Sequence, residues 1–382
     1  MDDIALLTRN HVDLLPAGGL EAKLKLGRPL RVKLGIDVTS PDIHIGRAIP
    51  LQRMRAFQDA GHIGVLIVGD YTTRIGDPSG RSAERPILSD GEIDANAQTY
   101  VDQAMQILDP DRTEVRFNGE WLAKLSFADV VRLTRTLTVA QLLEREDFAK
   151  RIAAGHPVSV SELLYPLMQA YDSVAIEADV ELGGTDQLYN LLAGRTVMEA
   201  YGLDPQIVLT TPLLLSWDGA KMSSSLGNNI PLAAPPEEQF GRTMRIPDTM
   251  LEDWYRLVVE ERAPGGEPME AKLTLARFIV TRSYGVDTAR DAEAHFTRVV
   301  REGSAPAEVP EALLPDGDPV HLPALLAEVF GLSTSEVRRM IGQGGVKVDG
   351  SPVADIDIAR EVITGAVVQA GKRRFVRFSA DS

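Results

Sequence analysis

The sequence contains no cysteine, only six histidines and no long apolar run. The absence of thiols excludes disulfide bonds, thiolate metal sites and cysteine nucleophiles. The histidines show no HExxH spacing, so a zinc hydrolase centre is not expected. No apolar run approaches the roughly 18 residues of a membrane span, and we expect no membrane association. The composition is otherwise globular, 44% hydrophobic over 382 residues, which is long enough for two or three domains.

The net charge of −15 disfavours general affinity for nucleic acid, because non-specific binding is mostly neutralisation of phosphates by Lys and Arg. The charge is uneven along the chain. Residues 320–382 carry eight Lys or Arg against seven Asp or Glu, which leaves −16 on the remainder. This near-neutral tail with clustered arginines is where we expect contact with RNA. The acidic start lacks the basic-then-apolar order of a secretion signal and predicts a cytoplasmic protein.

The first part of the chain alternates strands and helices. Apolar runs predict strands at 30–36, 63–68 and 114–117, and helical periodicity predicts helices at 45–60 and 93–108, the second capped by Asp90. This order is typical of an α/β fold with a Rossmann-like, doubly wound parallel sheet, whose ligand site lies at the carboxyl ends of the strands. The fingerprint GxGxxG is absent after the first strand, which disfavours a dinucleotide-dependent dehydrogenase.

The remaining sequence predicts further helices and a small terminal unit. Helical patterns are expected at 1–28, 120–180, 188–201 and 237–302, with strands at 207–209 and 213–215, and the last 60 residues combine helices 322–330 and 333–342 with strands near 346–348, 367–368 and 374–378. We therefore predict a catalytic domain over 1–230 with a helical insertion near 120–160, a helical domain over 231–305, a linker over 306–320, and an α+β domain over 321–382.

The turn after the first strand carries His44, Gly46 and Arg47 at the start of a helix. Free N–H groups and the helix dipole favour a phosphate there, and glycine lets the backbone approach closely. A lone histidine on a turn is more often a structural hydrogen-bonding group. The second signal is the Gly-flanked, Ser-rich stretch Lys221 to Ser225, which suits a mobile, positively charged lid. Alone, that stretch is equally typical of a surface loop.

Together, His44–Arg47 and Lys221–Ser225 resemble the HIGH and KMSKS motifs of class I aminoacyl-tRNA synthetases. The resemblance implies a reaction at the α-phosphate of ATP that expels pyrophosphate, with Mg²⁺ accompanying ATP and no permanently bound cofactor. The catalytic residues it implies are His44, Lys221, Arg47 and Thr39. The ATP-binding residues it implies are Gly35, Asp37, His44, Gly46, Asp186, Lys221, Met222, Ser223, Ser224 and Ser225.

Tyr165, Gln169 and Asp172 are spaced so that they lie on one face of a helix. Polar groups in this otherwise apolar helix are costly to bury without a partner, and a polar ligand would supply one. The pattern resembles the tyrosine-binding helix of bacterial tyrosyl-tRNA synthetases. By that resemblance Asp172 accepts the phenol hydroxyl, while Tyr165 and Gln169 hold the α-ammonium group. Phenylalanine would then be rejected by roughly 10⁴–10⁵-fold, because it leaves the buried carboxylate without its donor.

Three further stretches agree with this family in order along the chain. They are the loop 69–81, Asn118 after the third predicted strand, and the loop 183–187. The resemblance assigns Asp186 to the ribose of ATP and Gln187 to the reacting carboxylate side of tyrosine. The complete set of tyrosine-binding residues that it implies is Lys33, Thr72, Asp77, Asn118, Tyr165, Gln169, Asp172 and Gln187.

Residues 333–378 are similar to the small RNA-binding domain that this family shares with a ribosomal small-subunit protein. The RNA-facing residues implied are Arg338, Arg339 and Lys347. The family resemblance further implies tRNA(Tyr) as a partner, held by the helical segment and the C-terminal domain. It also implies a homodimer formed through the insertion near 120–160.

The sequence departs from the family pattern at four positions. Arg47 replaces the second histidine of the first motif, Val38 stands where proline is usual, Pro50 lies in the first motif helix, and Ser224 replaces the second lysine of KMSKS. An arginine still stabilises phosphate charge, or it obstructs the adenosine pocket. Two alternatives therefore stay open: a paralogue that activates tyrosine or an analogue without charging tRNA, and a non-catalytic protein that binds tyrosine or RNA.

Overall fold

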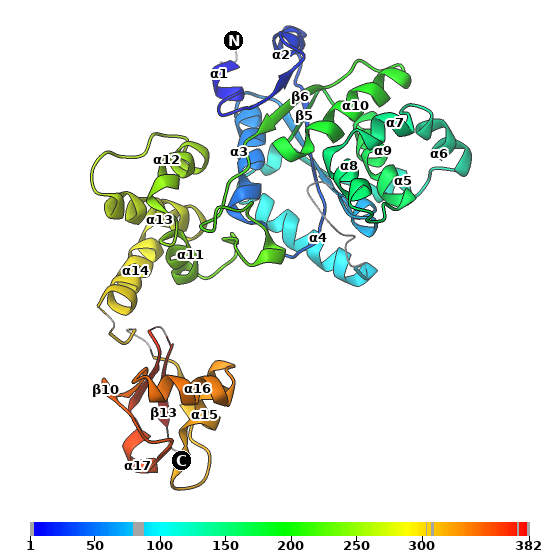
Figure 1. Ribbon diagram of the computed structural model, residues 1–382. Helices are drawn as coiled ribbons and strands as arrows, with labels where there is room; N and C mark the ends of the chain where they lie inside the picture. The colour runs from blue at the N-terminus through cyan, green and yellow to red at the C-terminus, as the bar shows by residue number, and fades with distance from the viewer. Residues whose placement is uncertain (1–3, 79–87, 303, 307–308, 373, 380–382) are drawn as a thin grey trace. The chain divides into compact units, whose positions relative to one another are not determined.

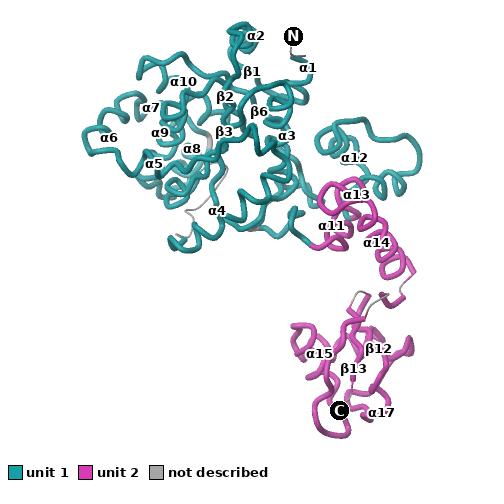
Figure 2. The backbone as a smooth tube through the Cα atoms, turned by 180° about the vertical axis from the view of Figure 1, so that it is seen from behind, with its two compact units in different colours: residues 1–234, 245–275 teal, residues 235–244, 276–382 magenta. Residues whose placement is uncertain are grey.

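The computed structural model describes residues 4–78, 88–302, 304–306, 309–372 and 374–379. Its backbone forms two compact units, residues 1–234 with 245–275, and residues 235–244 with 276–382 (Figure 2). Each unit has its own sheet. Within the described residues, no helix combines the length and the apolar character needed to cross a membrane.

The first unit is built on a six-stranded sheet in the order β1-β6-β5-β2-β3-β4. The strands are β1 (Leu14–Leu15), β2 (Arg31–Ile36), β3 (Ile63–Val68), β4 (Thr113–Phe117), β5 (Val180–Gly184) and β6 (Ile207–Thr211). All pair in parallel except β1, which runs antiparallel to β6. The predicted doubly wound parallel sheet is thus confirmed. Strand β3 is a continuous apolar run because helices cover both faces, whereas β2 and β5 carry the charged residues Lys33 and Glu181.

Helices lie on both sides of this sheet (Figure 1). The helices of the first unit include α1 (Ile4–Leu7), α2 (Gly19–Leu24), α3 (Ile45–Asp59), α4 (Asp90–Ala104), α5 (Gly119–Leu122), α6 (Phe127–Thr134), α7 (Val139–Leu143), α8 (Glu146–Ala153), α9 (Val160–Ala175), α10 (Leu188–Ala200), α12 (Leu251–Trp254) and a π-helix over Tyr255–Val259. Side chains of α3 and α4 pack on one face in the main core, which includes Phe57 and Tyr100. On the other face, Val65 and Ile67 pack against Ile176, just after α9.

Four details differ from the sequence predictions. The first 28 residues are not continuously helical, because β1 pairs with β6 between α1 and α2. Helix α4 is capped by Ser89, not Asp90: the Ser89 hydroxyl accepts from the Glu92 N–H, and the Glu92 carboxylate accepts from the Ser89 N–H in return. That helix also ends at Ala104 rather than at 108. The predicted strand at 213–215 is reduced to an isolated bridge between Leu215 and Lys221.

The second unit contains α11 (Pro236–Thr243), α14 (Val286–Phe296), a π-helix over Thr297–Arg301 and the C-terminal domain, while α13 (Pro268–Tyr284) spans the boundary between the two units. The C-terminal sheet has the order β10-β9-β12-β13-β7. Its strands are β7 (Glu311–Leu313), β9 (Val346–Val348), β10 (Ser351–Pro352), β12 (Val367–Ala370) and β13 (Arg374–Ser379).

Helices α15 (Leu322–Phe330), α16 (Thr334–Gly342) and α17 (Arg360–Ile363) accompany this sheet, and the predicted α+β composition of the terminal unit is confirmed. The segment 306–320 is not a plain linker. Within it β7 pairs in parallel with β13, and at its end β8 (Val320–His321) pairs with β11 (Asp357–Ile358). The four-part domain division otherwise stays a prediction.

Candidate active site

Five of the six strands of the first unit run parallel, so the predicted site residues lie together at the carboxyl ends of the strands. Asp37 follows β2, Thr72 follows β3, Asn118 follows β4 and Gln187 follows β5. Hydrogen bonds join the loops after β2, β3 and β4 to one another and to α9. One predicted stretch, residues 79–81 of the loop after β3, lies outside the described residues.

Asp37 joins the loop after β3 to helix α9. Its Oδ1 accepts from Thr72 Oγ1 at 2.8 Å, and its Oδ2 accepts from Tyr165 Oη at 3.0 Å. Gly69 makes this approach possible, because a Cβ atom there would lie 2.5 Å from both Asp37 Oδ1 and Thr72 Oγ1. Asp37, predicted at the ATP side, is therefore tied to two residues predicted to bind tyrosine.

Asp172 is almost fully buried and is held by two donors. Trp121 Nε1 donates to Oδ1 at 2.8 Å, and Asn118 Nδ2 donates to Oδ2 at 3.3 Å. Burial raises the pKa of Asp172 to about 7, against the opposing charge of Lys33 and the hydrogen bonds from Trp121 and Asn118. Asn118 itself is fixed by accepting from the Tyr71 N–H. The carboxylate is thus an oriented hydrogen-bond acceptor in a low-dielectric setting.

Gly35 leaves space above the sheet on the same side as Lys33 and α9, since residues 33 and 35 point to one face of β2. A Cβ atom at Gly35 would meet no atom within 4 Å, although the residue lies on a central strand. A side chain is expected to fill such a position in a packed sheet. Its absence leaves room for a ligand beside the Asp37 network.

Lys33 and Gln169 turn inward rather than toward that space. The Lys33 ammonium group is fully buried 2.9 Å from Glu181 Oε1, and Gln169 Nε2 donates to the same carboxylate oxygen at 3.1 Å. The predicted direct contact of Lys33 with tyrosine stays a prediction. In the structure its ammonium group binds α9 to the sheet, through Gln169 and Ser173.

Asp77 and Gln187 are also brought together. Gln187 Nε2 donates to Asp77 Oδ2 at 2.7 Å, and Gln187 Oε1 accepts from Asn190 Nδ2 at 2.9 Å. Arg145, from the helical insertion, donates to Asn190 Oδ1 at 2.8 Å and pairs with Asp147. This chain of contacts fixes the orientation of the Gln187 amide from outside the predicted pocket.

His44 is the N-cap of α3, and its Nδ1 accepts from the Arg47 N–H at 3.3 Å. The hydrogen of the neutral ring therefore belongs on Nε2, where it can be donated to a phosphate. Burial, with the positive charges of Arg47 and Lys221, lowers the pKa of His44 to about 3. Near neutral pH the ring is an uncharged hydrogen-bond donor.

This lowered pKa predicts a pH dependence of stability. The unfolded chain takes up a proton on His44 below its ordinary pKa of 6.5, whereas the folded chain does so only near 3. The stabilisation is complete above 6.5 and is lost as the pH falls toward 3. Relative to His44→Asn, which keeps a cap but does not titrate, the wild-type free energy of unfolding should fall by about 3 kcal/mol more between pH 7.5 and 4. Urea titrations measure this difference, and parallel curves would contradict it.

Arg47 stacks on an aromatic ring of the neighbouring helix. Its guanidinium carbon lies 5.5 Å from the centre of the Tyr100 ring in α4. Gly46 packs against His44, since a Cβ atom there would lie 3.2 Å from His44 Nδ1. The arginine that departs from the family motif is thus accommodated by α4 without displacing His44.

Lys221 forms an ion pair with Asp186, and its side chain is 52% exposed. In the same loop Met222 is buried, the Ser223 N–H donates to Asn228 Oδ1 at 2.8 Å, and Asn229 Nδ2 donates to Ser224 Oγ at 3.2 Å. The side chain of Ser225 lies outside the described residues, and Thr39 lies half-buried in the bend after β2. The loop therefore places its lysine beside the residue predicted to bind ribose.

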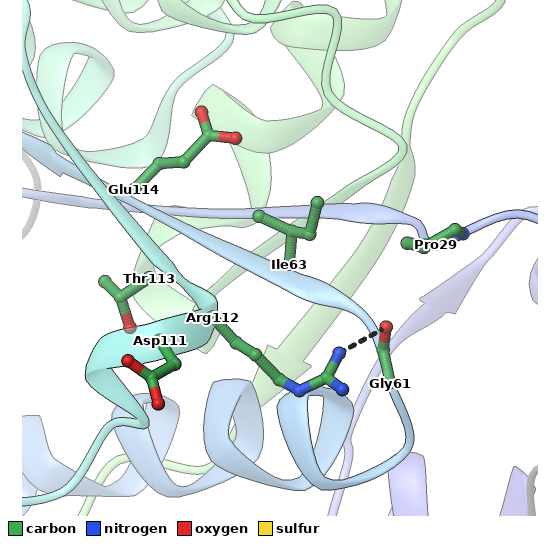
Figure 3. A pocket seen from close by; sticks show the side chains of 7 residues that line it. All are labelled: Pro29, Gly61, Ile63, Asp111, Arg112, Thr113 and Glu114. Atoms are coloured by element: carbon green, nitrogen blue, oxygen red, sulfur yellow. Dashed lines mark hydrogen bonds between the residues drawn. The ribbon is translucent and has the colours of Figure 1, made fainter.

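A pocket of the first unit opens near the amino ends of the strands, opposite the predicted site (Figure 3). The lining residues are Pro29, Gly61, Ile63, Asp111, Arg112, Thr113 and Glu114. They lie at or before the amino ends of β2, β3 and β4, and Arg112 Nη1 donates to the Gly61 carbonyl at 3.0 Å. None of the predicted site residues contributes to it.

In the second unit, Arg338 and Arg339 lie on α16 and Lys347 lies on β9. Arg338 Nη2 is 3.4 Å from His321 Nε2, and His321 Nδ1 is 2.7 Å from Asp357 Oδ1. The predicted RNA-facing residues are therefore on adjoining elements of the terminal domain, and their contact with RNA stays a prediction.

Sequence reasoning missed several residues that hold the site together. They are Trp121, Arg145, Asn190, Glu181 and Tyr100. The available signals were weak: a charged residue inside an apolar strand for Glu181, and an asparagine within an apolar helix for Asn190. The other three had no local signal, because their partners are distant in the sequence.

Comparison with known proteins is consistent with this geometry. The model of the family described as "tRNA synthetases class I (W and Y)" matches residues 25–300. The protein named tyrosine–tRNA ligase in Thermotoga maritima is 46% identical over 99% of this chain and 97% of its own length. The protein of the same name in Moorella thermoacetica is 46% identical over 98% of this chain and 95% of its own length.

Solved structures agree on the fold. The tyrosyl-tRNA synthetase of Archaeoglobus fulgidus, crystallised with L-tyrosine, has a TM-score of 0.63 at 21% identity and covers 76% of this chain and 98% of its own. A C-terminally truncated mitochondrial tyrosyl-tRNA synthetase of Coccidioides posadasii has a TM-score of 0.60 at 22% identity, over 76% of this chain and 91% of its own. At these identities the likeness supports the fold alone.

Proposed function

Because the chain belongs to the class I tRNA synthetases of the tryptophan and tyrosine family, we propose that it is a tyrosine–tRNA ligase. In the first step the tyrosine carboxylate attacks the α-phosphorus of ATP, and the bond to pyrophosphate breaks. In the second step a hydroxyl of the terminal adenosine of tRNA(Tyr) attacks the tyrosyl carbonyl, and AMP leaves. The observation that carries the choice of tyrosine is Asp172, a buried carboxylate oriented by Trp121 and Asn118.

The residues act by positioning and by charge stabilisation, without a covalent enzyme intermediate. His44 Nε2–H and Lys221 stabilise the negative charge that gathers on the phosphates, and Arg47 adds a permanent positive charge beside them. Asp186 exchanges its bond to Lys221 for the ribose when ATP enters, which frees Lys221 for the phosphates. Asp77 and Gln187, which are hydrogen-bonded to each other, are assigned to the amino and carboxylate groups of tyrosine. Mg²⁺ enters with ATP as part of the substrate.

Two alternatives to ordinary charging were raised by Arg47, and the comparisons do not favour either one. A paralogue that only activates tyrosine or an analogue would catalyse tyrosine-dependent ATP–pyrophosphate exchange without charging tRNA. A non-catalytic binder would show no exchange. Charging of a tRNA(Tyr) transcript with labelled tyrosine is therefore the experiment, and we expect tyrosyl-tRNA to accumulate with ATP and not without it. Exchange without charging would reject the proposal in favour of the paralogue.

The helical insertion supports a homodimer. The proposed location is the cytoplasm, where ATP and tRNA are available. Large apolar side chains of this region are exposed, including Phe127 at 83% and Val139 at 62%. Such a surface is typical of an interface. We expect the wild-type protein to have the mass of a dimer in light scattering at micromolar concentration, and Phe127→Asp to shift it to a monomer. A monomeric wild-type protein would contradict the proposed interface.

The C-terminal domain is proposed to hold tRNA, through Arg338, Arg339 and Lys347. It has its own hydrophobic core, which includes Leu326, Val337 and Phe378. A chain that ends at residue 302 should therefore keep tyrosine-dependent exchange within about threefold, while charging falls by about 10²-fold or more through loss of phosphate contacts. Loss of exchange to the same extent would mean that the domain has a structural role instead.

A further inference from the structure

A buried ion pair lies between the sheet and the helix that carries Tyr165 and Asp172. Lys33 of β2 and Glu181 of β5 are direct neighbours in the sheet, and both side chains are fully buried. Lys33 Nζ lies 2.9 Å from Glu181 Oε1 and donates to the Gln169 backbone oxygen at 2.8 Å and to Ser173 Oγ at 2.7 Å. These three contacts use all the N–H groups of the ammonium.

Stability alone does not account for this pair. The cost of removing two charges from water offsets most of their attraction, and apolar residues of similar volume are commonly as stable or more stable. The carboxylate is nevertheless held on both oxygens, because Ser173 Oγ and Gln206 Nε2 also donate to Oε2. Gly194 leaves room for them, since a Cβ atom there would lie 3.2 Å from Glu181 Oε2. Glu181 is therefore fixed in position as well as neutralised.

The fixed carboxylate dictates which way the Gln169 amide faces. Gln169 Nε2 donates to Glu181 Oε1 at 3.1 Å. A carboxylate paired with lysine only accepts hydrogen bonds, so the amide nitrogen must face it and the carbonyl Oε1 must face away. Gln169 shares one face of α9 with Tyr165 and Asp172. The amide thus offers its carbonyl oxygen as an acceptor on the face proposed to bind tyrosine.

We propose that Lys33 and Glu181 are positioning residues that orient Gln169, so that its carbonyl oxygen accepts from the α-ammonium group of tyrosine. Lys33 binds the backbone oxygen of Gln169 while Glu181 binds its side-chain amide, so this buried pair fixes both the backbone and the side chain of Gln169. The inference rests on the proposed function and deepens it. It replaces the predicted direct contact of Lys33 with tyrosine by a role that acts through Gln169.

Glu181→Gln tests this orientation. The substituted amide keeps the shape of glutamate but can present N–H groups, so Gln169 is free to turn over. Calorimetry should compare tyrosine and tyramine, which carry the ammonium group, with 3-(4-hydroxyphenyl)propionate, which lacks it. We expect the dissociation constants of tyrosine and tyramine to rise about tenfold or more, and that of the deaminated acid to change less than about twofold.

Two further variants separate orientation from folding. Lys33→Met combined with Glu181→Leu replaces the pair by apolar side chains, and we expect a retained melting temperature with the same selective loss. Glu162→Gln is the matched control, because it removes a buried carboxylate paired with Arg151 at the start of α9. It should lower the melting temperature without a preference among the ligands. An equal effect on all three ligands, or none, in both Glu181 variants would overturn the inference. Failure of the unaltered protein to bind tyrosine would reject the proposed function and the inference with it.

Discussion

Asp172→Asn is expected to remove most of the discrimination between tyrosine and phenylalanine. The native carboxylate accepts from Trp121 Nε1 and Asn118 Nδ2 and has further lone pairs for a phenol hydroxyl. Asparagine has one acceptor oxygen, so its amino group must face one of these donors or the phenol. A site built to accept a hydroxyl discriminates by roughly 10⁴–10⁵-fold, and we expect the ratio of kcat/KM values in ATP–pyrophosphate exchange to fall by at least 10²-fold.

The matched control is Asp179→Asn. Asp179 is also a buried carboxylate, paired with Arg28 and Lys23, but it directly precedes β5 and so lies at the amino ends of the strands, opposite the predicted site. Its loss should lower the melting temperature and leave the ratio of tyrosine to phenylalanine unchanged. Should Asp172→Asn keep the wild-type ratio, Asp172 would not read the phenol, and another residue would have to be sought.

Lys221→Ala is expected to slow adenylate formation by about 10²–10³-fold, with the dissociation constant of tyrosine unchanged. The lysine lies beside Asp186 and near enough to lower the pKa of His44, so its charge reaches both predicted parts of the ATP site. Because it stabilises charge that develops on the phosphates, its removal should reduce kcat more than it raises KM for ATP. Single-turnover formation of tyrosyl-adenylate measures this step directly.

Lys25→Ala, at an exposed lysine just after α2, controls for a simple loss of positive charge. It should leave adenylate formation unaltered. If Lys221→Ala instead turns over at the wild-type rate, or if it weakens tyrosine binding by the same factor as the rate, the lid role assigned to the loop is wrong.

The main elements of the fold were predictable from the sequence, because central parallel strands are continuous apolar runs. Strand β3 follows that pattern closely, whereas in β2 the residues Arg31 and Lys33 interrupt the apolar run. Two short strands, β1 and β7, were not predicted. Two-residue β1 and three-residue β7 are too short for a periodic pattern, and each is stabilised by a partner far along the chain, β6 and β13. Length was not the only factor, because three-residue β9 was predicted, and its partners β10 and β12 lie close to it in the sequence.

For the site, motifs and helical spacing placed the groups proposed to face the substrates, such as Asp37, Tyr165 and Asp172, close together. They did not identify the groups behind them. Trp121 lies on a four-residue helix 51 positions before Asp172, and Arg145 reaches Asn190 across 45 positions. Such contacts depend on how separate elements pack, which a single sequence does not encode locally. Lys33 illustrates the consequence: its contact with tyrosine stays a prediction, and its hydrogen bond to the Gln169 backbone oxygen had no signal in the sequence.

Tyrosine-dependent ATP–pyrophosphate exchange by the unaltered protein tests the central claim most directly, because it requires the phosphate site and the tyrosine pocket to work together. Labelled pyrophosphate should enter ATP when tyrosine is present, and at a rate several orders of magnitude lower when phenylalanine replaces it at the same concentration. Equal exchange with both amino acids would contradict the proposed recognition of the phenol hydroxyl by Asp172. No exchange with either one would contradict the assignment of an adenylate-forming site to the carboxyl ends of the parallel strands.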